Sequence, residues 1–81
     1  MLRVNIGGSL RTAVEGADAI DLEAETIDEL LRSLSLRYPR FEPLLKSGIA
    51  VAINGEIYRD NWYVKIPLDA EVFILPRIQG G

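Results

Sequence analysis

The chain contains no cysteine and no histidine. Without cysteine it can form neither a disulfide nor a thiolate metal site. Without histidine it lacks the commonest general base of enzymes and a preferred ligand of zinc. A chain of 81 residues also has little room for a deep pocket. We therefore expect no metal site, no bound cofactor and no self-contained active site.

The sequence also lacks a surplus of basic residues and any long apolar segment. Nine lysines and arginines stand against twelve acidic residues, giving a net charge of −3, whereas nucleic-acid-binding domains are usually basic. No stretch is long enough to span a membrane, and the N-terminus shows no signal-peptide pattern. The composition, 48% hydrophobic and 26% charged, is ordinary for one globular domain. We expect a cytoplasmic protein that binds neither nucleic acid nor membrane.

Apolar and polar residues alternate over positions 2–6, which predicts a strand with one buried face. Gly7-Gly8 after it favours a tight hairpin turn, because glycine readily takes the positive φ angles of such turns. A phosphate-binding loop is disfavoured, since no lysine follows at the required spacing. Ser9–Val14 is either a strand or an irregular turn, and we favour a strand near Ala19–Glu23.

A helix begins after Thr26, which forms a capping box with Glu29. Pro39 ends it, because proline disfavours helical backbone in the residue before it. The helix carries one apolar stripe at helical spacing, made of Ile27, Leu30, Leu31, Leu34 and Tyr38. Capping accounts for the acidic residues of the first turn, so we do not interpret them as a catalytic cluster.

The second half of the chain predicts three further strands. Ile49–Ile53 is apolar throughout, and Asn54-Gly55 after it is a strong signal for a hairpin turn. Before this strand, Phe41–Ser47 is a connection whose Leu44 and Leu45 close one end of the core. After the turn come a short strand at Glu56–Tyr58, a loop at Arg59–Leu68 and a last strand at Glu71–Leu75.

One helix can cover only one face of a sheet. We therefore predict an α+β fold, a mixed four- to five-stranded sheet with one long helix packed on one face. The residues expected to face the helix are Leu2, Val4, Ile6, Val51, Ile53, Val72 and Ile74. Phe73 and Leu75 would lie on the opposite face beside Ala50 and Ala52. We interpret these four residues as a docking patch, although single exposed apolar residues are common on proteins.

The last strand is followed by a short tail that ends in two glycines. We assign residues 1–76 to the domain and residues 77–81, from Arg77 to Gly81, to a flexible tail. Fully extended, these five residues span about 17 Å. Glycine has no Cβ, so Gly80 and Gly81 could pass through a narrow channel. Arg77 is either a solvated residue or the partner of an acidic group on another protein.

These features together resemble a known family. The residues on which the resemblance rests are Asn54-Gly55-Glu56, then Leu68-Asp69 with Glu71-Val72 before the last strand, and the terminal Gly80-Gly81. With the predicted order of strands and helix, the whole chain resembles the ThiS/MoaD-like sulfur carriers, β-grasp proteins related to ubiquitin.

The resemblance implies a function for the C-terminus. An E1-like enzyme would use ATP to adenylate the carboxylate of Gly81, and a sulfur donor would convert it to a thiocarboxylate. That sulfur would pass to an acceptor enzyme, either the large subunit of molybdopterin synthase or thiazole synthase. Arg77, Ile78, Gln79 and Gly80 would contact the partner together with the docking patch. An α-carboxyl group has a pKa near 3.5, so it is ionised at neutral pH and needs activation before a nucleophile can attack it.

The subfamily stays open. Pro76 and the long Thr26–Gly48 region resemble molybdopterin synthase small subunits, which we favour, whereas Gln79 resembles thiazole-forming carriers. Ala70 stands where the family usually has glycine, and Arg77 stands where a second proline is expected. A ubiquitin-like modifier joined to other proteins through its terminal glycine is an alternative, as is a binding module with incidental glycines.

Overall fold

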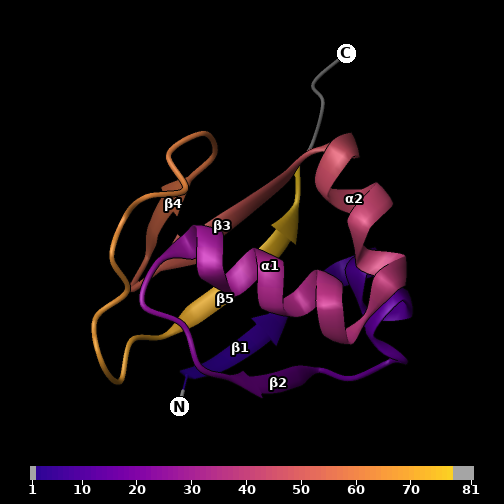
Figure 1. Cartoon of the computed structure of the whole chain (residues 1–81), viewed down its shortest axis with the longest axis horizontal. Coiled ribbons are helices and arrows are strands. Elements are labelled where there is room, and N and C mark those ends of the chain that lie inside the picture. The colour runs from indigo at the N-terminus through magenta and orange to yellow at the C-terminus, as the bar shows by residue number, and fades with distance from the viewer. Residues whose placement is uncertain (1, 78–81) are drawn as a thin grey trace.

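The computed structural model describes residues 2–77 of the chain (Figure 1). Within them five strands form one mixed sheet, in the spatial order β2-β1-β5-β3-β4. The strands are β1 (Leu2–Ile6), β2 (Ala19–Leu22), β3 (Ile49–Ile53), β4 (Glu56–Tyr58) and β5 (Val72–Pro76). The helices of the same residues are α1 (Ile27–Arg37), α2 (Glu42–Ser47) and two 3-10 helices, η1 (Gly8–Val14) and η2 (Pro39–Phe41).

The last strand of the chain lies at the centre of the sheet. β5 pairs parallel with β1 on one side and antiparallel with β3 on the other, and the remaining pairs are antiparallel. α1 crosses one face of this sheet, as Figure 1 shows. The predicted α+β fold is confirmed, and the C-terminal segment leaves from a strand that is hydrogen-bonded along both edges.

The predicted core is confirmed residue by residue. The seven strand residues expected to face the helix are all buried, as are four members of the helix stripe, Ile27, Leu30, Leu31 and Leu34. Tyr38, Leu44 and Leu45 are partly buried against the same cluster. At roughly 1.5–3 kcal/mol for each large apolar side chain removed from water, this single layer between sheet and helix is the main source of stability.

The start of α1 forms as the capping signal predicts, with one difference. The Glu29 N–H donates to Thr26 Oγ1 at 3.2 Å. The Glu29 carboxylate accepts from the N–H of Glu25, at 2.8 Å, rather than from that of Thr26. The N–H groups of Ile27 and Asp28 donate to backbone carbonyls of the 59–68 loop, so the helix start and this loop hold each other in place.

The prediction of a tight hairpin turn at Gly7-Gly8 is wrong. Gly7 keeps an extended backbone, with φ −96° and ψ 146°, and its N–H donates to the carbonyl of Ile74 at 2.9 Å. β1 thus continues along β5 instead of turning back. The chain then enters η1, which buries Leu10 and Val14, so β2 is reached through a 3-10 helix and not through a two-residue turn.

The Phe41–Ser47 segment is another difference, because it contains the helix α2 where the sequence predicts only a connection. Pro43 lies in its first turn, where proline is compatible with a helix. Gly48, with φ +111°, ends it. The predicted Asn54-Gly55 turn is confirmed, since both residues have positive φ angles, 49° and 89°.

Candidate functional site

The chain leaves the sheet through three residues, Leu75, Pro76 and Arg77, here called the tail root. Pro76 is paired with Ile49 of β3, and the Arg77 N–H donates to the Gly48 carbonyl at 3.3 Å. The pairing with this segment therefore continues one residue beyond β5. The side chain of Arg77 lies against Gly48, where a Cβ atom would come within 3.3 Å of Arg77 Cδ.

The other predicted tail residues, Ile78, Gln79, Gly80 and Gly81, lie outside the described residues. The prediction of a flexible tail and the predicted reactive carboxylate therefore stay predictions. What the structure describes is the point of departure of the tail and the surface around it.

The sheet face opposite α1, here called the open face, carries a row of three apolar side chains with Asn5 at one end, here called the apolar row. The strand register places Asn5, Phe73, Ala52 and Ile57 next to one another across four strands. Phe73 is 38% exposed and Ile57 is 55% exposed. Because β5 is central, this row runs through the middle of the open face, directly before the tail root.

The four predicted patch residues lie together on this face, and they differ in exposure. Ala50 and Ala52 are only 7% and 9% exposed, although they are not part of the core cluster beneath α1. Their cross-strand neighbours are Leu75 and Phe73, which are large enough to cover them. Phe73 and half-buried Leu75 therefore supply the contact area, and the two alanines let them lie close to the sheet.

Gly7 and Gly8, which follow β1, lie against the tail root on the side of the sheet occupied by β1. A Cβ atom at Gly7 would lie 2.7 Å from Leu75 Cδ2, closer than two carbon atoms can approach without a shift. A Cβ atom at Gly8 would lie 3.7 Å from Pro76 Cγ, which is ordinary contact. Leu75 thus sits between two small residues, Gly7 and Ala50.

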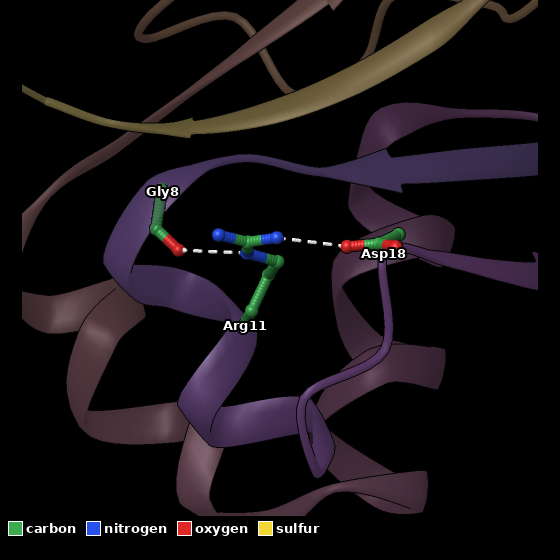
Figure 2. Close-up of polar contacts among 3 residues, drawn as sticks. All are labelled: Gly8, Arg11 and Asp18. Atoms are coloured by element: carbon green, nitrogen blue, oxygen red, sulfur yellow. Dashed lines mark hydrogen bonds and ion pairs between the residues drawn. The ribbon is translucent and has the colours of Figure 1, made fainter.

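Arg11 connects the start of η1 to Asp18 (Figure 2). Its Nη1 donates to Asp18 Oδ1 at 2.8 Å, and its Nε donates to the Gly8 carbonyl at 3.4 Å. The two side chains of the ion pair are 51% and 85% exposed, so the pair contributes at most about 1 kcal/mol. Its effect is local, since it links η1 to Asp18, just before β2.

The described residues around the tail root include few groups that could bind a metal ion or take part in a reaction. Within residues 2–77 there is no group of three acidic residues placed to hold a metal ion. A shallow hollow of about 710 Å³ is bordered by Leu2, Glu29 and Asp69 and does not include the tail root. What the described residues offer at the tail root is an apolar surface beside an exposed cation, Arg77.

Sequence reasoning missed Ile57, Gly7 and Gly48. Ile57 could have been found, because a two-residue Asn54-Gly55 turn sets the register that places it opposite Ala52. Gly48 follows an unpredicted helix, and no sequence pattern shows that Gly7 would meet Leu75. These contacts depend on segments that are far apart in the chain.

Comparison with known proteins decides the family. The sequence model of the ThiS family matches residues 4–81, nearly the whole chain and the terminal glycines with it. The chain belongs to the ThiS family. The resemblance to ThiS/MoaD-like sulfur carriers is therefore confirmed at the level of the family. A search of curated protein sequences finds no match.

Solved structures agree on the fold. SAMP1, the small archaeal modifier protein 1 of Methanosarcina acetivorans, is 26% identical, with a TM-score of 0.80 over 98% of this chain and 94% of that one. A chain of the BexX/CysO complex of Amycolatopsis orientalis is 23% identical, with a TM-score of 0.78 and 98% of both chains covered. CysO of Mycobacterium tuberculosis is 20% identical, with a TM-score of 0.76 over 94% of this chain and 98% of that one. This ThiS-family chain has the β-grasp fold.

None of the helices within residues 2–77 is both long and apolar enough to cross a bilayer.

Proposed function

We propose that this chain is a sulfur carrier. An E1-like enzyme adenylates the carboxylate of Gly81 with ATP, and the acyl group is then converted to a thiocarboxylate that donates its sulfur. The observation that carries this proposal is the ThiS-family match, which extends to the last residue. The neighbouring M. acetivorans protein, whose name describes a modifier, supports the broader idea of a ubiquitin-like protein.

The chemistry needs little from this chain beyond its C-terminus. A carboxylate oxygen of Gly81 attacks the α-phosphorus of ATP, and pyrophosphate leaves. A sulfide equivalent from the sulfur donor then attacks the acyl carbon, and AMP leaves. The groups that catalyse both steps belong to the partner enzymes, since this chain has neither histidine nor cysteine. The chain is a carrier subunit and not an enzyme, and it acts in the cytoplasm, where ATP is supplied.

The open face and the tail bind different parts of the activating enzyme. Phe73 and Leu75, seated on Ala50 and Ala52, bind the outside of the activating enzyme. Residues 77–81 enter its active site, and their extended reach of about 17 Å allows this while the domain stays outside. Arg77 pairs with an acidic group at the entrance, because it is exposed and lies at the start of the tail.

Among the sulfur pathways we propose molybdopterin synthesis, with the large subunit of molybdopterin synthase as the acceptor. Pro76 at the end of β5 and the region from Thr26 to Gly48 support this choice. Thiazole formation for thiamin, with thiazole synthase as the acceptor, is the alternative that Gln79 supports. Incubating the thiocarboxylate form with each acceptor separates the two, since only the true acceptor returns Gly81 to a carboxylate.

A second candidate function is protein modification through Gly81. It is favoured by the 26% identity to an archaeal modifier protein. Denaturing gels of a tagged chain expressed in its own host distinguish the two functions. A ladder of covalent products supports modification, whereas their absence together with a thiocarboxylate supports sulfur transfer alone.

The dependence on Gly81 is tested by ATP–pyrophosphate exchange with the cognate E1-like enzyme. The full chain should support exchange, and a chain lacking only Gly81 should lose it. Circular dichroism of the shortened chain provides the control for folding. Equal exchange by both chains would show that the terminal glycine is incidental and would remove the basis of the proposal.

A further inference from the structure

We infer that Gly7 is a positioning residue for partner docking, acting through Leu75. Its missing side chain leaves the space in which Leu75 lies against the sheet at the start of the tail. The inference rests on the proposed function, because it concerns the surface that the activating enzyme would bind.

The backbone conformation of Gly7 does not require glycine. Its φ of −96° and ψ of 146° are extended values that any residue adopts. Gly8, Gly16, Gly48 and Gly55 all differ from it in having positive φ angles, which L-residues rarely take. The reason for glycine at position 7 must therefore lie in its contacts.

Those contacts are with the tail root and the strand before it. A Cβ atom at position 7 would lie 2.7 Å from Leu75 Cδ2 and 3.3 Å from the carbonyl oxygen of Ile74. The Ile74 oxygen is held by the Gly7 N–H at 2.9 Å, so the backbone there has little freedom. The side chain of Leu75 is the part that must move.

On the side away from Gly7, Leu75 faces the neighbouring strand β3. Its other cross-strand neighbour is Ala50, which is already 93% covered, with 7% of its surface exposed. A Leu75 side chain pushed from Gly7 must shift toward Ala50 or away from the sheet, and either shift takes it out of its half-buried position. Because Leu75 is the last open-face residue before the tail, this changes the shape of the docking surface at the start of the tail.

The test is a double-mutant cycle measured by ATP–pyrophosphate exchange with the cognate E1-like enzyme. Four chains are compared, namely the wild type, Gly7→Ala, Leu75→Ala and the double variant, each with its thermal unfolding curve. Gly7→Ala should raise the KM for the carrier about fivefold and leave kcat within about twofold. In the Leu75→Ala background, where the Cδ atoms are gone, the same change should alter KM by less than about twofold.

Gly16→Ala is the matched control. A Cβ atom at Gly16 would have nothing within 4 Å, but its φ of +80° makes the substitution strained. It should lower the unfolding temperature without changing KM, which separates lost stability from altered docking. If Gly7→Ala fails to fold, the double variant should still fold, because the 2.7 Å contact with Leu75 Cδ2 is absent there.

Three results would overturn the inference while the wild type remains active. These are an unchanged KM for Gly7→Ala, an equal rise in KM in both backgrounds, or a double variant that stays unfolded. A wild-type chain that supports no exchange would instead count against the proposed function, so the two failures are distinguishable.

Discussion

Neighbouring residues of β5 serve opposite sides of the sheet. Ile74 is fully buried under α1, whereas Phe73 beside it is 38% exposed on the open face. The alternation follows from the two-residue period of a strand. Docking and stability can therefore be changed separately by substituting adjacent positions.

Phe73→Glu should weaken docking without unfolding the chain. The substitution removes the apolar side chain that the partner would bury, and it places a carboxylate there that would have to lose its water on binding. We therefore expect the KM for the activating enzyme to rise at least about 30-fold. The free energy of unfolding should change by less than about 1 kcal/mol, as for most surface substitutions. Exchange kinetics and urea unfolding measure the two effects.

Leu36→Glu is the control for this prediction, because Leu36 is 85% exposed but lies on α1, on the other side of the sheet. It should leave KM unchanged. An unfolded Phe73→Glu chain would mean that Phe73 belongs to the core, and an unchanged KM would mean that the open face is not the docking surface.

Tyr58 offers a prediction about pH. Its hydroxyl donates to Glu56 Oε2 at 2.6 Å, and this hydrogen bond, with smaller contributions from burial and from the carboxylate charge, raises the pKa of Tyr58 above its ordinary value of 10.0. Since the folded state holds the proton more tightly, the resulting stability is fully present below pH 10 and is lost as the pH rises through the raised pKa.

Glu56→Ala should bring the pKa of Tyr58 back toward 10.0. The absorbance of tyrosinate measures it, in a background where Tyr38 and Tyr63 are replaced by phenylalanine. Wild-type stability should also fall more steeply above pH 10 than that of Glu56→Ala. Identical titration curves for the two chains would contradict the role given to this hydrogen bond.

Among the elements, α1 could be predicted from the sequence and η1 could not. α1 has a capping box, a stripe at helical spacing and a proline after its end, all of which are local signals. η1 is a 3-10 helix without such a repeat. Gly7-Gly8 at its start favours a hairpin by local preference, which takes no account of the pairing of Gly7 with β5. α2 was missed because Pro43 and Gly48 suggested irregular structure, although they mark its start and end.

The same distinction applies to the candidate site. The alternation in β5 was enough to place Phe73 and Leu75 on the face opposite the helix. Gly7 and Gly48 are separated from the tail root by long stretches of chain, and only tertiary packing brings them there. A single sequence contains no local trace of such contacts.

Thr26→Ala tests the helix start. It removes the acceptor for the Glu29 N–H and should lower the free energy of unfolding by about 1 kcal/mol. Urea unfolding measures the loss. Thr12→Ala is the matched control, because the Thr12 hydroxyl is exposed and donates only to the Ser9 carbonyl within η1. A loss at Thr26 no larger than that at Thr12 would contradict the capping role.

The whole molecule places its C-terminal strand where a carrier needs it. β5 is paired on both edges, its inner residues are buried in the core, and its outer residues form the open face that leads to the tail root. The stable part of the fold therefore extends to the residue before the tail, so a partner that binds the open face also holds the start of the tail.

The mass of the intact chain tests the central claim most directly. The chain is incubated with its cognate E1-like enzyme, ATP and a sulfur donor, and pyrophosphate exchange in the same mixture shows that the enzyme is active. We predict a mass gain equal to the replacement of one oxygen by sulfur, located at the C-terminus and absent when Gly81 is deleted. An unchanged mass in the presence of active enzyme would contradict the assignment of this chain as a sulfur carrier.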